Sequence, residues 1–495
     1  MKKYFFILFA ILFNVSACQP DNNEITENPA SNKKSKISIK FNSSIKSRKE
    51  TFNENNVYNQ TALFIAGKNS ELFKTIQKQD YYKNYKNKIN ESWKKTTSKN
   101  LNSINKWIKK NDITNNLDTS DLFYPFSGPD FLYANAFFPY ANNYILVGLE
   151  NPGKLPNLEK MDNSQTAEYL FKLYHSLRYI NQAGYFTTKQ MQTDFADSSL
   201  NGIIHLLLFY ISKSNHDISD ISSVFIDNFG QEKEKKDFQI ADKYINGIKI
   251  EFYDKKSDKL KKLYYFPVDL SDENLKDQLG FLMFLSNFGY KNTFMKSASY
   301  ILHDGEFSIC RDLILNQSKK ILQDDSGIPF KILNNSNFNL KLYGNYSRTI
   351  KDFENNFQED LYKTLLTREI IPLDFKIGYN SWKGETILMF ATHSEKPVNK
   401  PVTYKRDKES IIYKVQIKSS WKKIPLNSNL FEGLQPVDYY FRDGLYKYTI
   451  GNCSNQNECE TFRLLAVKHG FEDAFVVAFY QKNRISLEEA EKMLK

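Results

Sequence analysis

Two turn-rich segments of this chain contain residue types that can carry out acid–base or nucleophilic chemistry. The first spans residues 124–130 (YPFSGPD), and the second spans residues 323–327 (QDDSG). Their candidate side chains are Ser127, Asp130, Asp324 and Asp325. Paired carboxylates can serve as acid and base, or as metal ligands, when they are held beside a substrate. With His303, the serine and an aspartate can also be drawn as a Ser-His-Asp triad.

The interpretation that assigns no function to these two segments is that they are turns. Ser, Gly and Asp are frequent in turns for backbone reasons alone, and no neighbouring motif supports a triad. The chain contains no H-E-x-x-H, no G-x-S-x-G and no phosphate-binding glycine loop. We therefore expect no catalytic residue here, and an enzyme with the four side chains above is the alternative.

The histidines of the central region give no metal site. They are scattered without ligand spacing: His175, His205, His216, His303 and His393. His175 and His205 lie in apolar helical segments, so we expect both to be core residues. The sequence predicts neither a metal nor a cofactor.

Cys453 and Cys459 lie six positions apart, around a predicted strand-to-helix connection. A disulfide between them is expected in an oxidising compartment. Metal binding is the competing interpretation, but it lacks a third and a fourth ligand. Cys310 lies in an apolar helical pattern and is expected to be buried.

The last ninety residues show the clearest structural pattern. In residues 411–418, apolar and polar side chains alternate, as in a half-buried strand. The further predicted elements are a strand at Leu445–Gly451 after the turn 442–444, a helix at about Glu458–Lys468 stopped by Gly470, and a strand at Ala474–Phe479. This βαββαβ pattern predicts a four-stranded sheet with helices on one face and an open, ligand-binding face opposite.

The segment from about Glu409 to Lys495 resembles the SPOR (sporulation-related repeat) domain of bacterial envelope proteins. The resemblance rests on YKVQI, GLYKYTIGN, and GFEDAFVVAF followed by a basic residue and an isoleucine, in that order. It implies a ferredoxin-like domain that binds peptidoglycan, chiefly glycan strands whose stem peptides have been removed. Residues 394–408, with two prolines and a charge cluster, are the predicted linker before it.

The resemblance places glycan binding on Gln416, Ser419 and Lys447. The amide and the hydroxyl can bond N-acetyl and hydroxyl groups, and Lys447 can pair with a lactyl carboxylate, without the bidentate geometry of arginine. Leu445 stands where an aromatic residue often lies, so sugar stacking is expected from Tyr440. The alternatives are that these are ordinary solvated positions, and that the domain is a ferredoxin-like module for a protein partner.

The N-terminus predicts export. Two lysines, the apolar run 4–13 and Val-Ser-Ala before Cys18 form a signal peptide over residues 1–17. Val-Ser-Ala-Cys resembles a lipobox, which implies a lipidated Cys18; a plain signal peptide is the alternative. The resemblance with Gln19 after the cysteine favours the outer membrane, and a peptidoglycan-binding tail favours its periplasmic face. A surface-export signal that includes Asp21 and Glu24 is the alternative. Residues 18–56 are polar and basic, and predict a flexible tether.

The formal net charge of +11 fits an acidic partner. Export excludes nucleic acid, whereas glycan without stem peptides exposes a lactyl carboxylate on each muramic acid. A lysine-rich solvated surface accounts for much of the excess.

Residues 57–393 form the remaining, central domain. Helices are predicted at 70–110, Ser164–Asn181, Leu200–Ser214, Asp272–Phe288, Glu306–Gln323 and Lys351–Thr367. Strands are predicted at Tyr144–Leu149, Val224–Ile226, Ile248–Tyr253 after the turn Asn246-Gly247, Leu263–Pro267 and Thr386–Thr392. Their alternation predicts an α+β or α/β layered fold. The two turn-rich segments, with residues 344–350, also resemble uncharacterised bacterial envelope proteins.

The expected protein is an envelope lipoprotein, anchored to the membrane by lipid, that binds peptidoglycan through its C-terminal domain. Its central domain is expected to be a non-catalytic scaffold, or to bind a protein partner that the sequence does not identify. The division site, where peptide-free glycan is made, is one expected location of this protein. The alternative is a cell-wall hydrolase or other envelope enzyme that the C-terminal domain targets.

Overall fold

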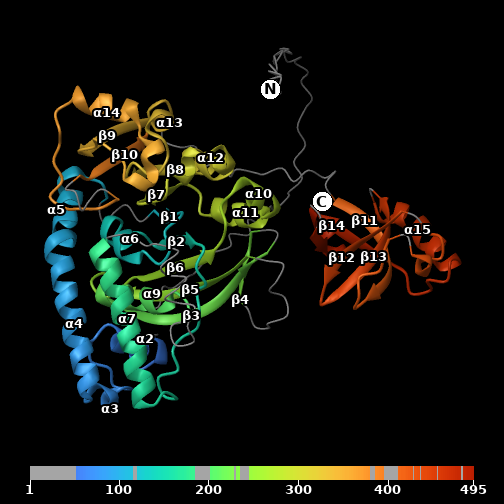
Figure 1. The fold of residues 1–495 in the computed structure, drawn as a ribbon, viewed down its shortest axis with the longest axis horizontal. Coiled ribbons are helices and arrows are strands. Elements are labelled where there is room, and N and C mark those ends of the chain that lie inside the picture. The colour runs from blue at the N-terminus through green and yellow to red at the C-terminus, as the bar shows by residue number, and fades with distance from the viewer. Residues whose placement is uncertain are drawn as a thin grey trace, which may run out of the picture. The chain divides into compact units, whose positions relative to one another are not determined.

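The computed structural model describes residues 52–114, 120–183, 201–227, 230–234, 245–379, 385–394, 411–426, 428–434, 436–453, 455–480 and 483–494. The predicted signal peptide, Cys18, most of the tether and nearly all of the linker lie outside these ranges. Residues 52–394 and residues 411–494 each contain their own sheet and core (Figure 1). Within the described ranges, no helix is both long and apolar enough to span a bilayer.

The central part is built on a ten-stranded mixed sheet in the order β4-β3-β5-β6-β2-β1-β7-β8-β10-β9. The strands are β1 (Leu122–Tyr124), β2 (Asn143–Gly148), β3 (His216–Ile226), β4 (Glu232–Glu234), β5 (Ile245–Asp254), β6 (Leu260–Pro267), β7 (Lys291–Met295), β8 (Ser318–Gln323), β9 (Phe338–Gly344) and β10 (Ile387–His393). The middle strands β6, β2, β1, β7 and β8 run parallel, and the outer strands pair antiparallel.

Both faces of this sheet are buried. On β2, Tyr144 and Leu146 enter one hydrophobic core, whereas Ile145 and Val147 enter the other. Strands buried on both sides need nearly continuous apolar sequence, as β2 and β6 have. The result is a layered α+β fold, as predicted.

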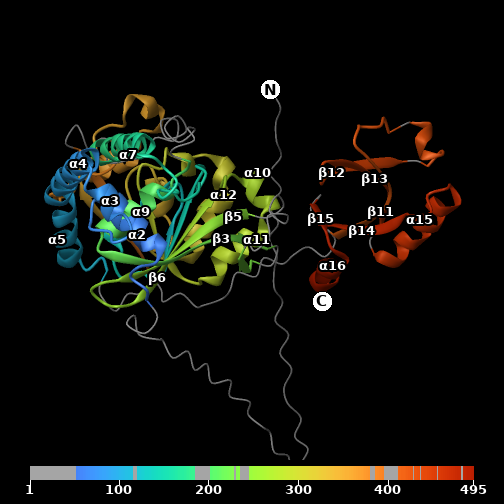
Figure 2. The same ribbon diagram turned by 90° about the horizontal axis from the view of Figure 1, so that it is seen from below.

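Helices cover each face (Figures 1 and 2). The first core contains residues of α2 (Val57–Ile65), α4 (Asp80–Thr96), α5 (Asn102–Asn111), α6 (Phe131–Phe137), α7 (Asn163–Ala183) and α9 (Ile204–Lys213). The second contains residues of α10 (Asp272–Asp277), α11 (Leu279–Asn287), α12 (Ser308–Gln317), α13 (Phe330–Asn334) and α14 (Glu359–Leu366). Shorter helical segments are α3 (Lys74–Gln77), η1 (Thr97–Leu101), η3 (Ile301–His303), η4 (Gly305–Phe307) and η5 (Lys351–Asn356).

Three sequence-based expectations for this part are wrong. The helix predicted at Glu306–Gln323 ends at Gln317, and the next six residues form β8, because the apolar spacing there also suits a buried strand. Asn246-Gly247 lies inside β5 and is not a turn. His175 is exposed on α7, whereas His205 is buried as expected.

The C-terminal part is a five-stranded antiparallel sheet in the order β12-β13-β11-β14-β15. The elements are β11 (Ile411–Ser420), η8 (Asn429–Phe431), β12 (Val437–Arg442), β13 (Leu445–Cys453), α15 (Gln456–Lys468), β14 (Phe475–Tyr480), β15 (Asn483–Ile485) and α16 (Leu487–Leu494). Strand β15 was not predicted. In the described residues between β11 and β12, a 3₁₀ turn stands where the βαββαβ pattern has its first helix.

Two local predictions for this part are confirmed. Asp443 and Gly444 both have positive φ, 55° and 75°, as a tight hairpin turn between β12 and β13 requires. Gly470, with φ of 87°, directly follows the C-cap of α15. The core of this sheet, formed by residues such as Tyr413, Val415 and Tyr448, packs with residues of α15 and α16.

Candidate functional sites

The face of the C-terminal sheet opposite that core carries polar side chains. On β11, Lys414 and Gln416 alternate with the buried Tyr413 and Val415. A β-bulge between Gln416 and Lys418 then shifts the alternation. As a result Ser419 pairs with Lys447 on β13, whereas Lys418 pairs with the buried Tyr448.

Three of the predicted glycan-binding residues form one network on this face. The Tyr440 hydroxyl donates to Oε1 of Gln416 at 2.6 Å. Nε2 of Gln416 in turn donates to Oγ of Ser419 at 3.4 Å. The Tyr440 ring contacts Phe479 edge-on, with centroids 5.1 Å apart. Burial raises the pKa of Tyr440, so its hydroxyl stays protonated and able to donate at neutral pH.

The fourth predicted residue, Lys447, already has a partner. Its Nζ lies 2.8 Å from a carboxylate oxygen of Asp443, which also lies 3.7 Å from Nε of Arg442. Lys414 is similarly paired with Asp438 at 2.5 Å. The lysines of this face are therefore less available to a ligand carboxylate than the sequence alone predicts.

Arg484 is a further basic residue of this face, which the family resemblance did not single out. It lies on β15 opposite Phe479, and its Nη1 donates to the backbone oxygen of Ala478 at 3.4 Å. Its guanidinium also interacts electrostatically with the Tyr440 side chain. The signal was present in the sequence, since Arg484 is the basic residue before the isoleucine in the closing motif, but its position on an unpredicted strand concealed it.

A disulfide joins Cys453, at the end of β13, to Cys459 in the first turns of α15, with Cα atoms 5.5 Å apart. It connects the strand that carries Lys447 to the helix packed behind the sheet. Cys310 is free and buried in α12, and burial raises the pKa of its thiol, so it is not poised as a nucleophile.

The other candidate site lies in the central part, where the parallel strands end. The loops after β1, β7 and β8 start from the same edge of the sheet, since these strands are parallel neighbours. Ligands of open α/β sheets commonly bind at this edge. Both sequence-predicted segments, residues 124–130 and 323–327, lie there.

After β1, Asp130 forms a buried ion pair. Its Oδ2 lies 3.0 Å from Nζ of Lys296, and the two side chains are 2% and 1% exposed. Tyr124 donates its hydroxyl to the same oxygen at 3.0 Å, and Oδ1 caps α6 by accepting from the Tyr133 backbone at 3.1 Å. Lys296 lies over the Tyr133 ring, 4.3 Å from its centroid. These contacts give Asp130 a structural role.

Ser127 also has backbone partners. Its Oγ lies 3.0 Å from the carbonyl oxygen of Gly128 and 3.1 Å from that of Val147, and accepts from the Val147 amide at 3.1 Å. Burial lowers the pKa of His303 to about 4, and its buried Nε2 has no hydrogen-bond partner among the described residues. None of the hydrogen bonds of Ser127 involves His303, so the structure does not support the triad.

Asp324 and Asp325 are the chemically distinctive pair. Asp324 accepts from the Ser297 amide at 2.8 Å, and from the amide and hydroxyl of Ser326 at 3.0 and 2.5 Å. Asp325 accepts from the Tyr300 hydroxyl. Burial, and next the charge of Asp324, raise the pKa of Asp325 to about 7. Burial also raises the pKa of Asp324, so this pair can hold a proton near neutral pH.

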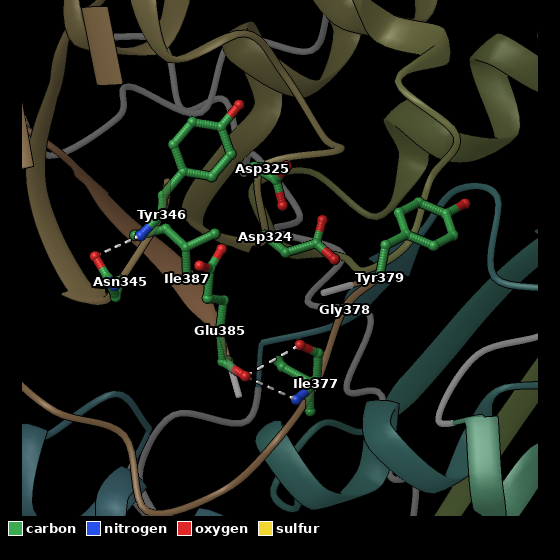
Figure 3. A pocket seen from close by; sticks show the side chains of 10 residues that line it. Asp324, Asp325, Asn345, Tyr346, Ile377, Gly378, Tyr379, Glu385 and Ile387 are labelled. Atoms are coloured by element: carbon green, nitrogen blue, oxygen red, sulfur yellow. Dashed lines mark hydrogen bonds between the residues drawn. The ribbon is translucent and has the colours of Figure 1, made fainter. Parts of the chain in front are cut away.

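The space beside the pair is small. The cavity has a volume of about 10 Å³, and Figure 3 shows the carboxylates of Asp324, Asp325 and Glu385 around it. That volume holds roughly one water molecule. The loop after β7 contains three non-glycine residues with positive φ, Ser297, Ser299 and Tyr300, a strained conformation that often marks functional sites.

A ligand-sized hollow lies elsewhere on the central part. Its volume is about 460 Å³, and its lining includes Leu149, Val224, Gly247 and Pro267. No lining residue of this hollow is ionisable. Asp324 and Asp325 therefore do not line this hollow.

No group of three or more His, Cys, Asp or Glu side chains suited to a metal ion occurs in the described part of the chain. No family model matches the sequence, and comparison with curated proteins and with solved structures finds no match.

Proposed function

We propose that this protein is a bacterial envelope lipoprotein that binds peptidoglycan glycan strands through the exposed face of its C-terminal sheet. In this proposal the central part is a scaffold or binds a protein partner. The observation that carries it is the Tyr440–Gln416–Ser419 network, which places hydrogen-bonding groups together on a sheet face opposite the hydrophobic core.

The strand order supports a SPOR-like, ferredoxin-like domain. In β12-β13-β11-β14 the first strand of the unit lies between the third and the fourth, and every pairing is antiparallel, as in a βαββαβ ferredoxin-like sheet. The 3₁₀ turn η8 in place of the first helix, and the added strand β15, are departures at the periphery of that arrangement.

The chemistry of the face suits an acidic sugar polymer. Gln416 and Ser419 can exchange hydrogen bonds with N-acetyl amides and hydroxyls, and the aromatic ring of Tyr440 can contribute stacking. The charged side chains described on this face comprise four cations (Lys414, Arg442, Lys447 and Arg484) and two anions (Asp438 and Asp443), a net charge of +2. A glycan strand with free lactyl carboxylates would complement this charge.

Co-sedimentation of the purified full-length protein with sacculi tests the proposal. We expect stronger pelleting with amidase-treated sacculi, which lack stem peptides, than with intact sacculi. Gln416→Ala should reduce pelleting, whereas Lys468→Ala, on helix α15 behind the sheet, should not. If the wild-type protein pellets with neither preparation, the glycan-binding proposal is wrong, and the protein-partner alternative takes its place.

A cell-wall hydrolase or other envelope enzyme is the second candidate. It is favoured by the buried Asp324–Asp325 pair, since a carboxyl group with a pKa near neutrality can act as a general acid or base. The one-water cavity and the separate, uncharged hollow favour the scaffold instead. Zymography on sacculi decides between them: clearing by the wild-type chain that is lost in Asp325→Asn would establish the enzyme.

A further inference from the structure

We infer that Arg484, on the added strand β15, binds the carboxylate of the ligand on this face, with the Tyr440 hydroxyl beside it. This inference rests on the proposed glycan binding and names its charged subsite. It moves the carboxylate-binding role from Lys447, to which the sequence resemblance assigned it, to a residue on a strand outside the βαββαβ pattern.

Three of the cations described on this face already lie beside a carboxylate. Lys447 and Arg442 share the carboxylate of Asp443, at 2.8 and 3.7 Å, and Lys414 lies 2.5 Å from that of Asp438. A ligand carboxylate would have to displace these partners. Arg484 differs, because no Asp or Glu of the described residues lies within ion-pairing distance of its guanidinium.

Arg484 keeps most of its hydrogen-bonding capacity. A guanidinium has five N–H donors in a planar fork, and the hydrogen bond of this one goes to the uncharged Ala478 carbonyl. The charge of Glu489 also acts on it, but from beyond ion-pairing distance. Arg484 is half-buried, so a carboxylate that reaches it would meet a partly desolvated cation. Charge-assisted, bidentate pairs of arginine with carboxylate are among the stronger polar contacts in proteins.

Arg484 lies beside the residues proposed to bind the glycan. Its guanidinium interacts electrostatically with the Tyr440 side chain, whose hydroxyl donates to Gln416 at 2.6 Å. The cation and the amide that would contact an N-acetyl group therefore both lie next to one tyrosine. A sugar that carries both an N-acetyl group and a lactyl carboxylate can engage the two groups together.

The experiment measures binding for every combination of two protein variants and two forms of the ligand. Full-length wild-type protein and Arg484→Gln are each titrated with amidase-treated sacculi, before and after the glycan carboxylates are converted to methyl esters. We expect Arg484→Gln to weaken binding roughly tenfold or more, esterification to weaken wild-type binding to a similar extent, and the variant to be insensitive to esterification. Intact sacculi, whose lactyl groups are in amide linkage, distinguish the lactyl carboxylate from those of the stem peptides.

Two further variants test whether a loss of binding comes from the Arg484 guanidinium itself or from misfolding. Arg463→Gln removes an arginine of α15 that is paired with Glu460, and should leave binding unchanged. Arg484→Lys retains the charge and should recover part of the affinity, which a merely misfolded domain would not. Wild-type affinity in Arg484→Gln, or undiminished discrimination against the ester by that variant, would overturn the inference while leaving glycan binding intact. Absence of wild-type binding would overturn both.

Discussion

The hydroxyl of Tyr440 on β12 lies 2.6 Å from Oε1 of Gln416 on β11, although β13 separates these two strands. The Tyr440 side chain therefore extends across β13. Thr449 of β13, which pairs with Gln416, is accordingly only 1% exposed. The amide of Gln416 is thus held in place before any ligand arrives, and preorganisation of this kind reduces the entropy lost on binding.

Tyr440→Phe tests that arrangement. The substitution removes the hydrogen bond to Gln416 and keeps the ring against Phe479. We expect roughly a threefold to tenfold loss of affinity for peptide-free glycan, as for one neutral hydrogen bond, with little change in thermal stability. Tyr81→Phe, which removes an exposed hydroxyl of the central part, should leave sedimentation unchanged. Equal binding by both variants would show that the hydroxyl does not position the amide.

The disulfide predicts a domain-specific response to reduction. Its closed loop is short, so loss of the Cys453–Cys459 bond should lower the unfolding free energy of residues 411–494 by about 2 kcal/mol. Calorimetry with and without reductant would detect the fall in one transition. The Cys453→Ser, Cys459→Ser double variant should show that same fall and no further effect of reductant. A shift in the transition of the central part would contradict the assignment.

The buried ion pair of the central part should contribute strongly to its stability. Lys296→Met leaves the Asp130 carboxylate buried without its cation, which typically costs about 3–5 kcal/mol. Urea denaturation of the full chain would measure the loss. Lys95→Met breaks the exposed pair with Glu91 and serves as the control, with no measurable change expected. Comparable losses in the two variants would argue against this view of Lys296.

Asp325 predicts a pH dependence of stability. Its pKa is raised to about 7 in the folded protein, from a usual value near 4, so the folded state binds more protons between these values. Its contribution to the unfolding free energy therefore falls as the pH rises from about 4 to about 7, and is level above that. In urea denaturation at pH 5 and pH 7.5, Asp325→Asn should show a smaller decrease than the wild-type protein. An unchanged pH dependence would mean that Asp325 titrates normally.

The N-terminal sequence predicts lipidation. Metabolic labelling with palmitate should mark the wild-type protein and not Cys18→Ser, and the variant should leave the membrane fraction. Labelling of the variant would show that another residue is modified, and release of an unlabelled wild-type protein would favour a plain signal peptide.

The sequence predicts regular elements better than it predicts the sites. The alternation at residues 411–418 indicated β11, but not the bulge that brings Ser419, in place of Lys418, into register with Lys447. A bulge depends on the partner strand, and local periodicity does not contain it. The helical spacing of Leu313, Ile314, Ile321 and Leu322 predicts a helix where β8 lies, and only the sheet beside these residues distinguishes strand from helix.

The candidate sites show the same division between local and long-range information. Asp130, Asp324 and Asp325 were identified by type and do gather at one edge of the central sheet, since parallel strands end together. Their partners Lys296 and Tyr300 come from a loop after β7, a strand that the sequence did not indicate. Arg484 likewise required β15. The sequence identifies the chemical type of each candidate residue. The contacts that determine its role come from segments that are distant in the chain.

The ion pairs on the exposed face of the C-terminal sheet have a consequence for selectivity. Because Lys414 and Lys447 are paired with Asp438 and Asp443, a carboxylate placed beside either lysine also meets an acidic group. Dense charge alone therefore gains less from these lysines than a carboxylate that reaches Arg484, and rejection of wrong partners contributes to specificity as much as attraction of the right one. Among the cations described on this face, Arg484 is the one without a carboxylate at ion-pairing distance, so the proposed recognition would depend on a single placed contact more than on total charge.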